Sequence, residues 1–445
     1  MRNGQHKTAV FANRVKLMGT EAAFGFGSRI LEVEKSDGER VIRANLGQPD
    51  FPLPEHIAEA VIKAIRDGQT TYCDPQGLPE LRKALAEKIA ADRGLPEIDP
   101  ERVVVYPGAR PSIGFAQQSY CENGDEIIYP SPGYPLYESY IPYVGARPVP
   151  IQLQEDHGFS LTTEELEPLI SDFTKLIYLN FPSNPTGGVA TPEQSQALAE
   201  LILEKTPENV RVYSDEAYEA ITFDGEKHFS IASVPGMEER TIIASAVSKT
   251  YSWTGGRVGW AVYPTTEEAK VHRNLNINYV ASIPPYNQLG TVEALTSPLS
   301  EDAIRIMNDA FQRRRDQVVA GLNDIDGVRC QLPKGAFYVF PNIEGVVDRL
   351  GIQDAFDAQP LEVKKNSSPA TLFQLFLLHR YLVATMDRRS FCSIDSEGQH
   401  FLRLSIATGA EDLAVAVERM ETASRDSDGF REFMNSGVPK VLEVF

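Results

Sequence analysis

The sequence lacks closely spaced cysteines, long apolar runs and any excess of basic residues. Its four cysteines lie far apart and form no CxxC pair, so they give no disulfide or metal signal and are typical of a reducing compartment. No apolar run approaches the roughly 20 residues that a membrane-spanning helix needs. Residues 1–7 do not have the cationic start and apolar core of a signal peptide. We therefore expect a cytoplasmic protein with no metal site and no membrane span.

Acidic residues outnumber basic ones by 62 to 43, which gives a formal net charge of −19. Nucleic acids and anionic membranes both bind basic surfaces, so this charge disfavours both as partners. The chain has 445 residues, of which 42% are hydrophobic, and this exceeds what one compact core normally holds. We therefore expect two domains.

Apolar, β-branched runs alternate with segments of helical periodicity in the first part of the chain. The predicted strands are residues 102–106, 125–129, 175–180, 210–216, 242–247 and 258–263. The predicted helices are residues 54–67 and 79–91, with others that begin near residues 110 and 192. Such alternation indicates an α/β fold, in which a mostly parallel sheet is covered by helices on both faces.

The rest of the chain has a different pattern. Residues 266–325 show helical periodicity and predict a long helix that links the domains, with an apolar stripe formed by Ala303, Met307, Phe311 and Val318. The basic run 313–315 is predicted to be an exposed face of that helix. A smaller α+β unit is predicted from two strands and a helix, at residues 335–340, 401–406 and 373–381. The last twenty residues are predicted to be a surface extension.

A lysine lies where a predicted buried strand ends. Residues 242–247 form the strand, and Lys249 follows them closely. A desolvated lysine has a lowered pKa and can form a Schiff base with a carbonyl group. Arg257 follows, and its planar guanidinium can bind phosphate oxygens in pairs. Together they suit an aldehyde that carries a phosphate, as pyridoxal phosphate does, although a chain with 43 Lys and Arg contains many such pairs by chance.

Polar and aromatic side chains follow other predicted strands. Asp215 and Glu216 end one strand, Asn184 lies in the turn after another, and Tyr134 lies on the loop after a third. The small residues 107–109 lead into a helix whose first N–H groups can bind an anion. Open α/β sheets bind ligands at the carboxyl ends of their strands, so these segments predict a binding site there.

Taken in this order, the segments resemble the class I/II aminotransferases, which are pyridoxal-phosphate enzymes of fold type I. The resemblance covers roughly residues 42–425 and depends on many short motifs in one fixed order. It implies a large domain, residues 54–320, and a smaller α+β domain built from both chain ends. Residues 1–53 would then form an N-terminal arm and part of the small domain, and residues 321–445 the rest of it. A homodimer with shared active sites is also implied.

The resemblance assigns roles around the cofactor ring. It implies that Lys249 carries the Schiff base and that Asp215 holds a proton on the pyridine nitrogen, because only the pyridinium is a strong electron sink. Tyr218 and Asn184 resemble hydrogen-bond donors to the phenolic oxygen of the ring. Tyr134 matches the aromatic residue that stacks on the ring face.

The resemblance also assigns a phosphate site, formed by Gly108, Ala109, Arg110, Ser248 and Arg257. The family often has a serine at the position that Ala246 occupies here. Ser245 and Ser248 are the alternatives for the missing ligand. Tyr72 resembles a tyrosine that reaches the cofactor phosphate of the neighbouring subunit.

Substrate binding is implied at three positions. Arg403 resembles the arginine that binds the α-carboxylate, near Asn184, and Gly47 resembles a glycine whose backbone closes over the substrate. Arg110 stands where one branch of the family has a lysine that binds the distal carboxylate of acidic substrates. It is therefore expected either to bind such a carboxylate or to face phosphate or solvent.

The predicted function is transfer of an amino group, by a ping-pong mechanism, from an L-amino acid to a 2-oxo acid such as 2-oxoglutarate. The amino acid is expected to be acidic, such as aspartate, or else aromatic. A lyase, decarboxylase or oxidase on the same fold is the alternative, because fold alone does not select the reaction. A cofactor-sensing regulator is disfavoured, since the acidic chain has no basic helix-turn-helix in its first 45 residues.

Overall fold

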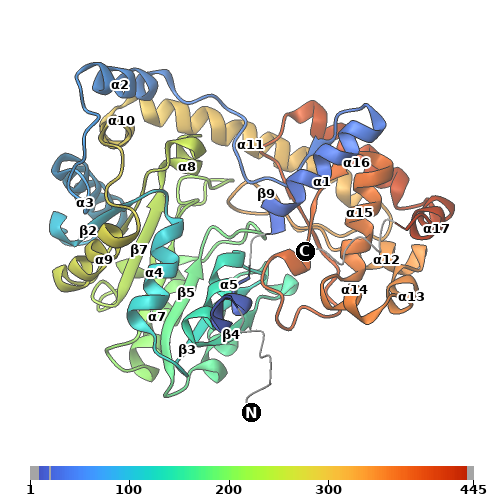
Figure 1. The fold of residues 1–445 in the computed structure, drawn as a ribbon, viewed down its shortest axis with the longest axis horizontal. Helices are drawn as coiled ribbons and strands as arrows, with labels where there is room; N and C mark the ends of the chain where they lie inside the picture. Colours follow the sequence, from blue (N-terminus) through green and yellow to red (C-terminus); the bar gives the residue numbers. More distant parts are fainter. Residues whose placement is uncertain (1–9, 20–21, 438–445) are drawn as a thin grey trace, which may run out of the picture.

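The computed structural model describes residues 10–19 and 22–437. Figure 1 shows a large sheet with helices packed around it and, beside it, a second group of helices from the C-terminal part of the chain. The long helix α11 (Leu299–Asn323) extends from the first group to the second (Figure 1). None of the helices within the described ranges is both long and apolar enough to cross a membrane.

The large sheet has seven strands and is mostly parallel, as predicted. Only β8 runs against its neighbours, since it pairs antiparallel with both β2 and β7. The order across the sheet is β2 (Val103–Tyr106), β8 (Gly259–Val262), β7 (Thr241–Ala246), β6 (Arg211–Asp215), β5 (Thr174–Asn180), β3 (Glu126–Ser131) and β4 (Arg147–Gln152). The six predicted strands are thus confirmed, with small shifts at their ends.

Helices cover both faces of this sheet, and its strands β2, β7 and β8 are buried along their whole length. In β2, Val103 and Val105 pack against α3, whereas Val104 and Tyr106 pack on the other face with α4. The helices of this part are α2 (Glu55–Arg66), α3 (Pro79–Arg93), α4 (Arg110–Tyr120), α5 (Pro135–Val144), α6 (Thr163–Leu166), α7 (Pro192–Lys205), α8 (Val247–Thr250), α9 (Thr266–Tyr279) and α10 (Pro285–Thr296).

Two small sheets form the centre of the second part. In the first, β1 (Ile42–Arg43) pairs in parallel with β10 (Val383–Ala384), so segments near both ends of the chain meet there. The second contains β11 (Met386–Asp387), β12 (Leu402–Ser405) and β9 (Tyr338–Val339), all antiparallel. This arrangement agrees with the α+β unit that the sequence predicts, while the domain boundaries at residues 53 and 320 stay predictions.

The surrounding helices include one that is buried almost all round, α15. They are α1 (Ala22–Asp37), α12 (Glu344–Leu350), α13 (Ile352–Asp357), α14 (Leu361–Lys365), α15 (Pro369–Tyr381), α16 (Ala410–Ala423) and α17 (Ser427–Asn435). Short 3₁₀ helices complete the chain: η1 (Asn13–Leu17), η2 (Pro100–Arg102), η3 (Glu155–His157), η4 (Glu167–Leu169), η5 (Ile231–Ser233), η6 (Thr254–Gly256) and η7 (Arg388–Ser390).

The helical periodicity predicted for residues 266–325 is confirmed, and the long helix predicted from the apolar stripe is α11. The segment is divided into α9, α10 and α11, with Pro284 and Pro298 at the starts of the last two helices. The apolar stripe of α11 is buried at Met307, Phe311 and Val318, as expected.

The prediction that the basic run 313–315 is an exposed face is wrong for Arg315. Its side chain is only 1% exposed, and its guanidinium bonds to Asp224 at 2.7 and 2.9 Å. Arg315 lies four residues after Phe311 and therefore on the same buried face of α11. A buried arginine needs a carboxylate partner, which in this case comes from a distant loop.

The last twenty residues are not simply a surface extension. Within α17, Phe430 and Phe433 are buried, and their rings lie 5.4 and 5.6 Å from that of Phe376 in α15. Their spacing of three residues puts both rings on one face of α17, which packs onto α15. The remaining residues, 438–445, lie outside the described ranges.

The burial of α15 leads to a stability prediction. Leu377 in α15 is fully buried, so Leu377→Ala should lower the free energy of unfolding by about 2–5 kcal/mol, because it removes packed atoms and leaves a cavity. Urea unfolding followed by circular dichroism measures the change. Leu361→Ala is the matched control, since Leu361 in α14 is 63% exposed and should shift the free energy by less than about 0.5 kcal/mol. Equal shifts in the two variants would contradict the packing described above.

Candidate active site

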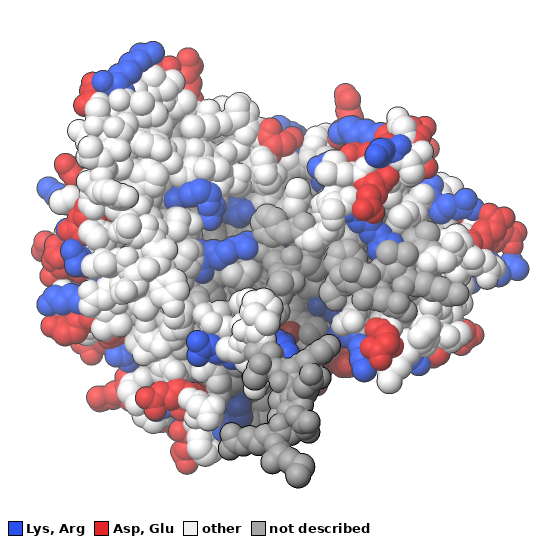
Figure 2. Space-filling view, viewed as in Figure 1, with Lys and Arg blue, Asp and Glu red and all other residues white. Residues whose placement is uncertain are grey.

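The middle strands of the large sheet bring the predicted site residues together. Strands β5, β6 and β7 are parallel neighbours, and Asn180, Asp215 and Ala244 lie side by side in their register. Lys249 lies on α8, the single helical turn that directly follows β7. Figure 2 shows basic side chains gathered around a hollow in the middle of this face, while acidic side chains lie mostly near its edges.

Lys249 lies under the loop that contains Gly47. Its Nζ donates a hydrogen bond to the backbone oxygen of Gly47 and lies 5.8 and 6.0 Å from the ring centroids of Phe337 and Tyr218. The Tyr218 hydroxyl is hydrogen-bonded to that of Tyr338 at 2.7 Å. A Cβ atom on Gly47 would come within 1.9 Å of the Tyr338 hydroxyl oxygen, so a side chain at this position would push the loop off the lysine.

Asp215 is a buried carboxylate. It is 5% exposed, and its Oδ2 accepts a hydrogen bond of 2.7 Å from the Tyr137 hydroxyl, while Oδ1 accepts one of 3.2 Å from the backbone N–H of Ala217. Burial raises the pKa of Asp215 to about 6, although these hydrogen bonds and the charge of Lys249 oppose the rise. A buried carboxylate of this kind is stabilised most by a cationic partner that is also shielded from water.

Arg403 is a buried cation with aromatic rings around it. Its guanidinium carbon lies 4.5 Å from the ring centroids of both Tyr338 and Phe391. It donates to Asn184 Oδ1 at 2.9 Å and to the backbone oxygen of Asn45 at 2.5 Å. Within the described residues, its Nε atom is buried without a hydrogen-bond partner. The residue can therefore bind a further acceptor, and a carboxylate fits its planar shape.

The turn before α4 is tightly packed against β8. Gly108 has a φ of +80°, and a Cβ atom there would lie 2.3 Å from Nη2 of Arg257. A Cβ atom on Gly259 would lie 2.3 Å from the backbone nitrogen of Ala109. The two glycines let the start of α4 and Arg257 approach each other closely, which brings backbone N–H groups and a cation to one point.

A second arginine adds to the positive charge at this turn. Arg257 donates to the backbone oxygen of Pro107 at 2.9 Å. Burial and the nearby charge of Arg110 lower the pKa of Arg257. Arg110 is the first residue of α4, and its guanidinium lies 5.8 Å from the ring centroid of Tyr134. Repulsion between the two cations is relieved by an anion, and a phosphate is a suitable one.

Of the two candidates for the missing serine at Ala246, Ser245 is excluded. Its hydroxyl donates to Glu219 Oε1 at 3.0 Å, and Ser245 lies on the same face of β7 as Ile243, which packs toward α3 rather than α4. Ser248 is half-buried at the second position of α8 and stays the other candidate.

Tyr72 lies on the loop between α2 and α3, and its side chain is 88% exposed. A single chain therefore does not bury it, in agreement with a role that needs a second subunit. The structure otherwise brings the expected residues together at one edge of the large sheet.

Sequence reasoning missed four residues that complete the site. Tyr137 bonds to Asp215, Tyr338 bonds to Tyr218, Phe391 covers Arg403, and Asn45 accepts from Arg403. Tyr137 lies in the first turn of α5, within an aromatic segment that follows a predicted strand, and this was a usable signal. Asn45 lies two residues before Gly47, which the resemblance did indicate, whereas Tyr338 and Phe391 come from distant segments with no recognisable spacing.

Comparison with known proteins identifies the family of this chain. The family model described as aminotransferase class I and II matches residues 39–420. The chain is 35% identical over 390 residues to a probable aspartate/prephenate aminotransferase of Aquifex aeolicus, which covers 87% of this chain and 92% of that protein. It is 32% identical over 411 residues to an aspartate aminotransferase of Bacillus subtilis, with 92% and 98% of the two chains covered.

Solved structures of aminotransferases are also similar to this chain. The crystal structure of the aspartate aminotransferase from Rhizobium meliloti superimposes with a TM-score of 0.83 at 32% identity, over 93% of this chain and 98% of that one. The aromatic aminotransferase from Pyrococcus horikoshii superimposes with a TM-score of 0.77 at 30% identity, over 90% and 99%. The fold, the arrangement of the site and these similarities together show that the chain is an enzyme of the class I and II aminotransferase family, whose members depend on pyridoxal phosphate.

Proposed function

We propose that the enzyme binds pyridoxal phosphate where β6 and β7 end, and that it moves an amino group between an L-amino acid and a 2-oxo acid such as 2-oxoglutarate. The observation that carries the proposal is that a buried carboxylate, Asp215, and a lysine, Lys249, lie in one site. A protonated pyridine nitrogen is a cation that suits the carboxylate of Asp215, and an aldehyde suits the amine of Lys249.

The residues of the site fit this cofactor at each of its polar ends. Asp215 would hold the ring nitrogen and Lys249 would bond to the aldehyde carbon, while the turn at Gly108, Arg257 and Ser248 would hold the phosphate. Tyr134 lies beside this turn and would cover the ring. When bound, the cofactor supplies an electron sink that makes the Cα proton of an attached amino acid acidic.

The chain's own residues bind the substrate and move the proton. Arg403 binds the α-carboxylate. Its guanidinium is held in the orientation for this by Asn184 and by two aromatic rings. Once the amino acid has displaced it from the aldehyde carbon of the cofactor, the amine of Lys249 would take the proton from Cα and deliver it to that former aldehyde carbon. The loop at Gly47 lies over this amine and limits its contact with water. Tyr218 is held toward the ring by its bond to Tyr338.

Arg110 and the names of the relatives support an acidic amino donor. Arg110 is a cation beside Tyr134 at the mouth of the site, where it can bind a distal carboxylate. Several relatives at 32–33% identity are aspartate aminotransferases. We therefore place aspartate first among donors, with aromatic amino acids second.

A homodimer with shared sites is part of the proposal. Tyr72 is exposed in the single chain, and so are Val10, Phe11 and Leu17 of the N-terminal arm. Burying these apolar side chains against a second copy would remove them from water and place Tyr72 at the partner's phosphate site. The four free cysteines support a reducing compartment such as the cytoplasm.

A panel of amino donors tests the function. The purified enzyme, loaded with pyridoxal phosphate and given 2-oxoglutarate, should form glutamate fastest with aspartate. Lys249→Ala is the control and should abolish the visible absorbance of the bound cofactor and nearly all turnover. Release of ammonia without glutamate would instead indicate a lyase and overturn the proposal.

Replacement of Arg110 tests the donor preference. Arg110→Gln should lower kcat/KM for aspartate by about 10–100-fold, because a charged hydrogen bond is lost, and should change that for phenylalanine by less than about threefold. Arg313→Gln is the matched control, since Arg313 is exposed on α11. Equal losses for both donors, together with weaker cofactor binding, would assign Arg110 to the phosphate.

Replacement of Asp215 tests the electrostatics of the site. The pKa of Asp215 is raised from 3.8 to about 6, so the folded chain binds more protons there than the unfolded chain, and stability falls as the pH rises between these values. Asp215→Asn carries no such charge. Without cofactor, its free energy of unfolding should rise relative to wild type by about 2–3 kcal/mol between roughly pH 4 and pH 7.

Urea unfolding of the cofactor-free proteins at several pH values measures this difference. The loaded variant should lose at least about 100-fold in kcat, as expected when a preorganised charge is removed. A stability difference between Asp215→Asn and wild type that does not change with pH would show that Asp215 is not a buried carboxylate with a raised pKa.

A further inference from the structure

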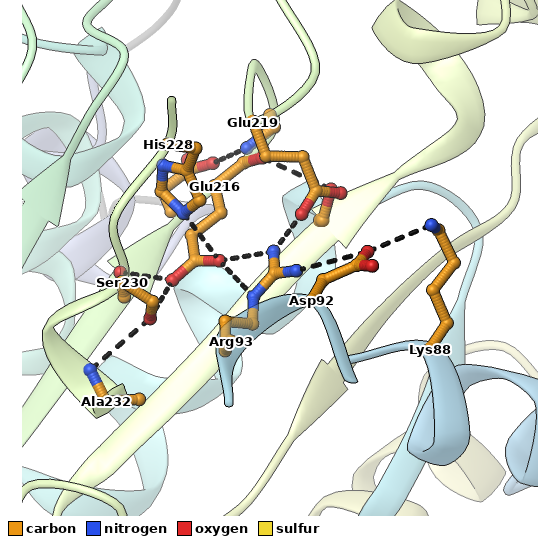
Figure 3. A network of polar contacts seen from close by, with 12 residues as sticks. Lys88, Asp92, Arg93, Glu216, Glu219, His228, Ser230 and Ala232 are labelled. Carbon is orange, nitrogen blue, oxygen red and sulfur yellow. Dashed lines mark hydrogen bonds and ion pairs between the residues drawn. The ribbon is translucent and has the colours of Figure 1, made fainter. Parts of the chain in front are cut away.

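A cluster of buried charges lies behind the candidate active site. It consists of Arg93, the last residue of α3, Glu216 and Glu219 in the turn after β6, and His228 on the loop before η5. Figure 3 shows these side chains pointing toward one another, with Ser230 beside Glu216.

Glu216 is the centre of the cluster, which is defined by Arg93, Glu216, Glu219 and His228. Its side chain is 0% exposed, and Oε2 accepts from Nε and Nη2 of Arg93 at 2.9 and 2.6 Å. His228 Nε2 lies 3.0 Å from the same oxygen, and the hydroxyls of Ser214 and Ser230 donate to Oε1. Burial opposes ionisation, but Arg93 and His228 hold the pKa of Glu216 well below its usual range.

Glu219 connects the cluster to a second strand. It accepts a hydrogen bond from Arg93 and, on its other oxygen, one of 3.0 Å from the hydroxyl of Ser245 in β7. Ser245 stands four residues before Lys249 in the chain. The cluster therefore joins α3, the turn that follows β6, and the strand that leads to the lysine.

The cluster lies on the opposite side of β6 from the reaction. Side chains alternate along a strand, so Glu216 points toward α3, while Asp215 points toward Tyr137 and the cofactor side. The backbone N–H of Glu219 bonds to the oxygen of Glu216 at 2.9 Å and closes the turn that carries Tyr218. Holding Glu216 and Glu219 in place therefore also holds Asp215, which precedes Glu216, and Tyr218, which lies between the two glutamates.

We propose that Arg93, Glu216 and Glu219 are positioning residues, which set the spacing between Asp215 and Lys249 and hold Tyr218 in place from behind. This inference rests on the proposed function, because that spacing must match the distance from the ring nitrogen to the aldehyde carbon of one rigid cofactor. Buried ion pairs contribute little net stability, so a role in fixing geometry explains the cluster better than a role in stability alone.

Glu216→Gln tests the proposal, since it keeps the shape of the side chain and removes its charge. The affinity for pyridoxal phosphate, measured by equilibrium dialysis, should fall about tenfold, and kcat with aspartate should fall about 10–100-fold. KM for aspartate should change by less than about threefold, because Arg403 and Asn184 are untouched. Arg93→Lys, which keeps the charge but not the paired hydrogen bonds, should act in the same direction and replaces Glu216→Gln if that variant does not fold.

Asp224→Asn is the matched control, because it breaks another ion pair of a buried arginine, that with Arg315, away from the cluster. It should lose thermal stability but keep the cofactor affinity and kcat of the wild type. Cofactor affinity and kcat that stay at wild-type values in Glu216→Gln, or in Arg93→Lys, would reduce the cluster to a structural role and overturn the inference. A wild-type enzyme that neither binds pyridoxal phosphate nor transaminates would overturn the proposed function itself.

Discussion

Burial of the Asp215 carboxylate is the constraint on which the site depends. Taking this charge out of water costs free energy, and among the described residues two hydrogen bonds and the more distant charge of Lys249 offset part of that cost. A carboxylate kept in this way is prepared for a cation that arrives with a ligand. The parallel register of β5, β6 and β7 makes the arrangement possible, because it brings the ends of three strands to one edge.

The arginines of the site are likewise placed where charged groups of a ligand can bind. In a chain with a net charge of −19, Arg403 lies between two aromatic rings, and Arg110 and Arg257 lie next to each other at the start of α4. Arg403 keeps a buried Nε without a hydrogen-bond partner among the described residues, and the charge of Arg110 opposes that of Arg257, so an anion can bind at each place. Amino acids, 2-oxo acids and phosphates are anionic at the groups that would meet these arginines. The site therefore gains electrostatic energy when they bind, and its positive charge also attracts the substrates.

Much of the fold could be predicted from sequence, and so could the positions of several candidate site residues, because these depend on local patterns. Apolar runs predicted the six strands that frame the site, and the short polar segments after them predicted Asp215, Asn184 and Lys249. Pairing between distant segments could not be predicted in this way. Tyr338 meets Gly47 and Tyr218 only in the folded chain, and no spacing in the sequence indicates it.

The errors have the same origin. Arg315 belongs to a basic run that would normally be exposed, and its burial depends on Asp224, which lies 91 residues away in the chain. Phe430 and Phe433 are apolar residues near the chain end, and only α15 gives them something to pack against. Residue type predicts exposure well when a side chain acts alone and poorly when a distant partner decides it.

The central claim is that one amine, that of Lys249, bonds to the cofactor. Borohydride reduction of the enzyme loaded with pyridoxal phosphate, followed by proteolysis and mass spectrometry, tests this claim most directly. The account predicts that the added mass of the reduced cofactor lies on the peptide that contains Lys249. Attachment to a different lysine, or no attachment at all, would contradict it.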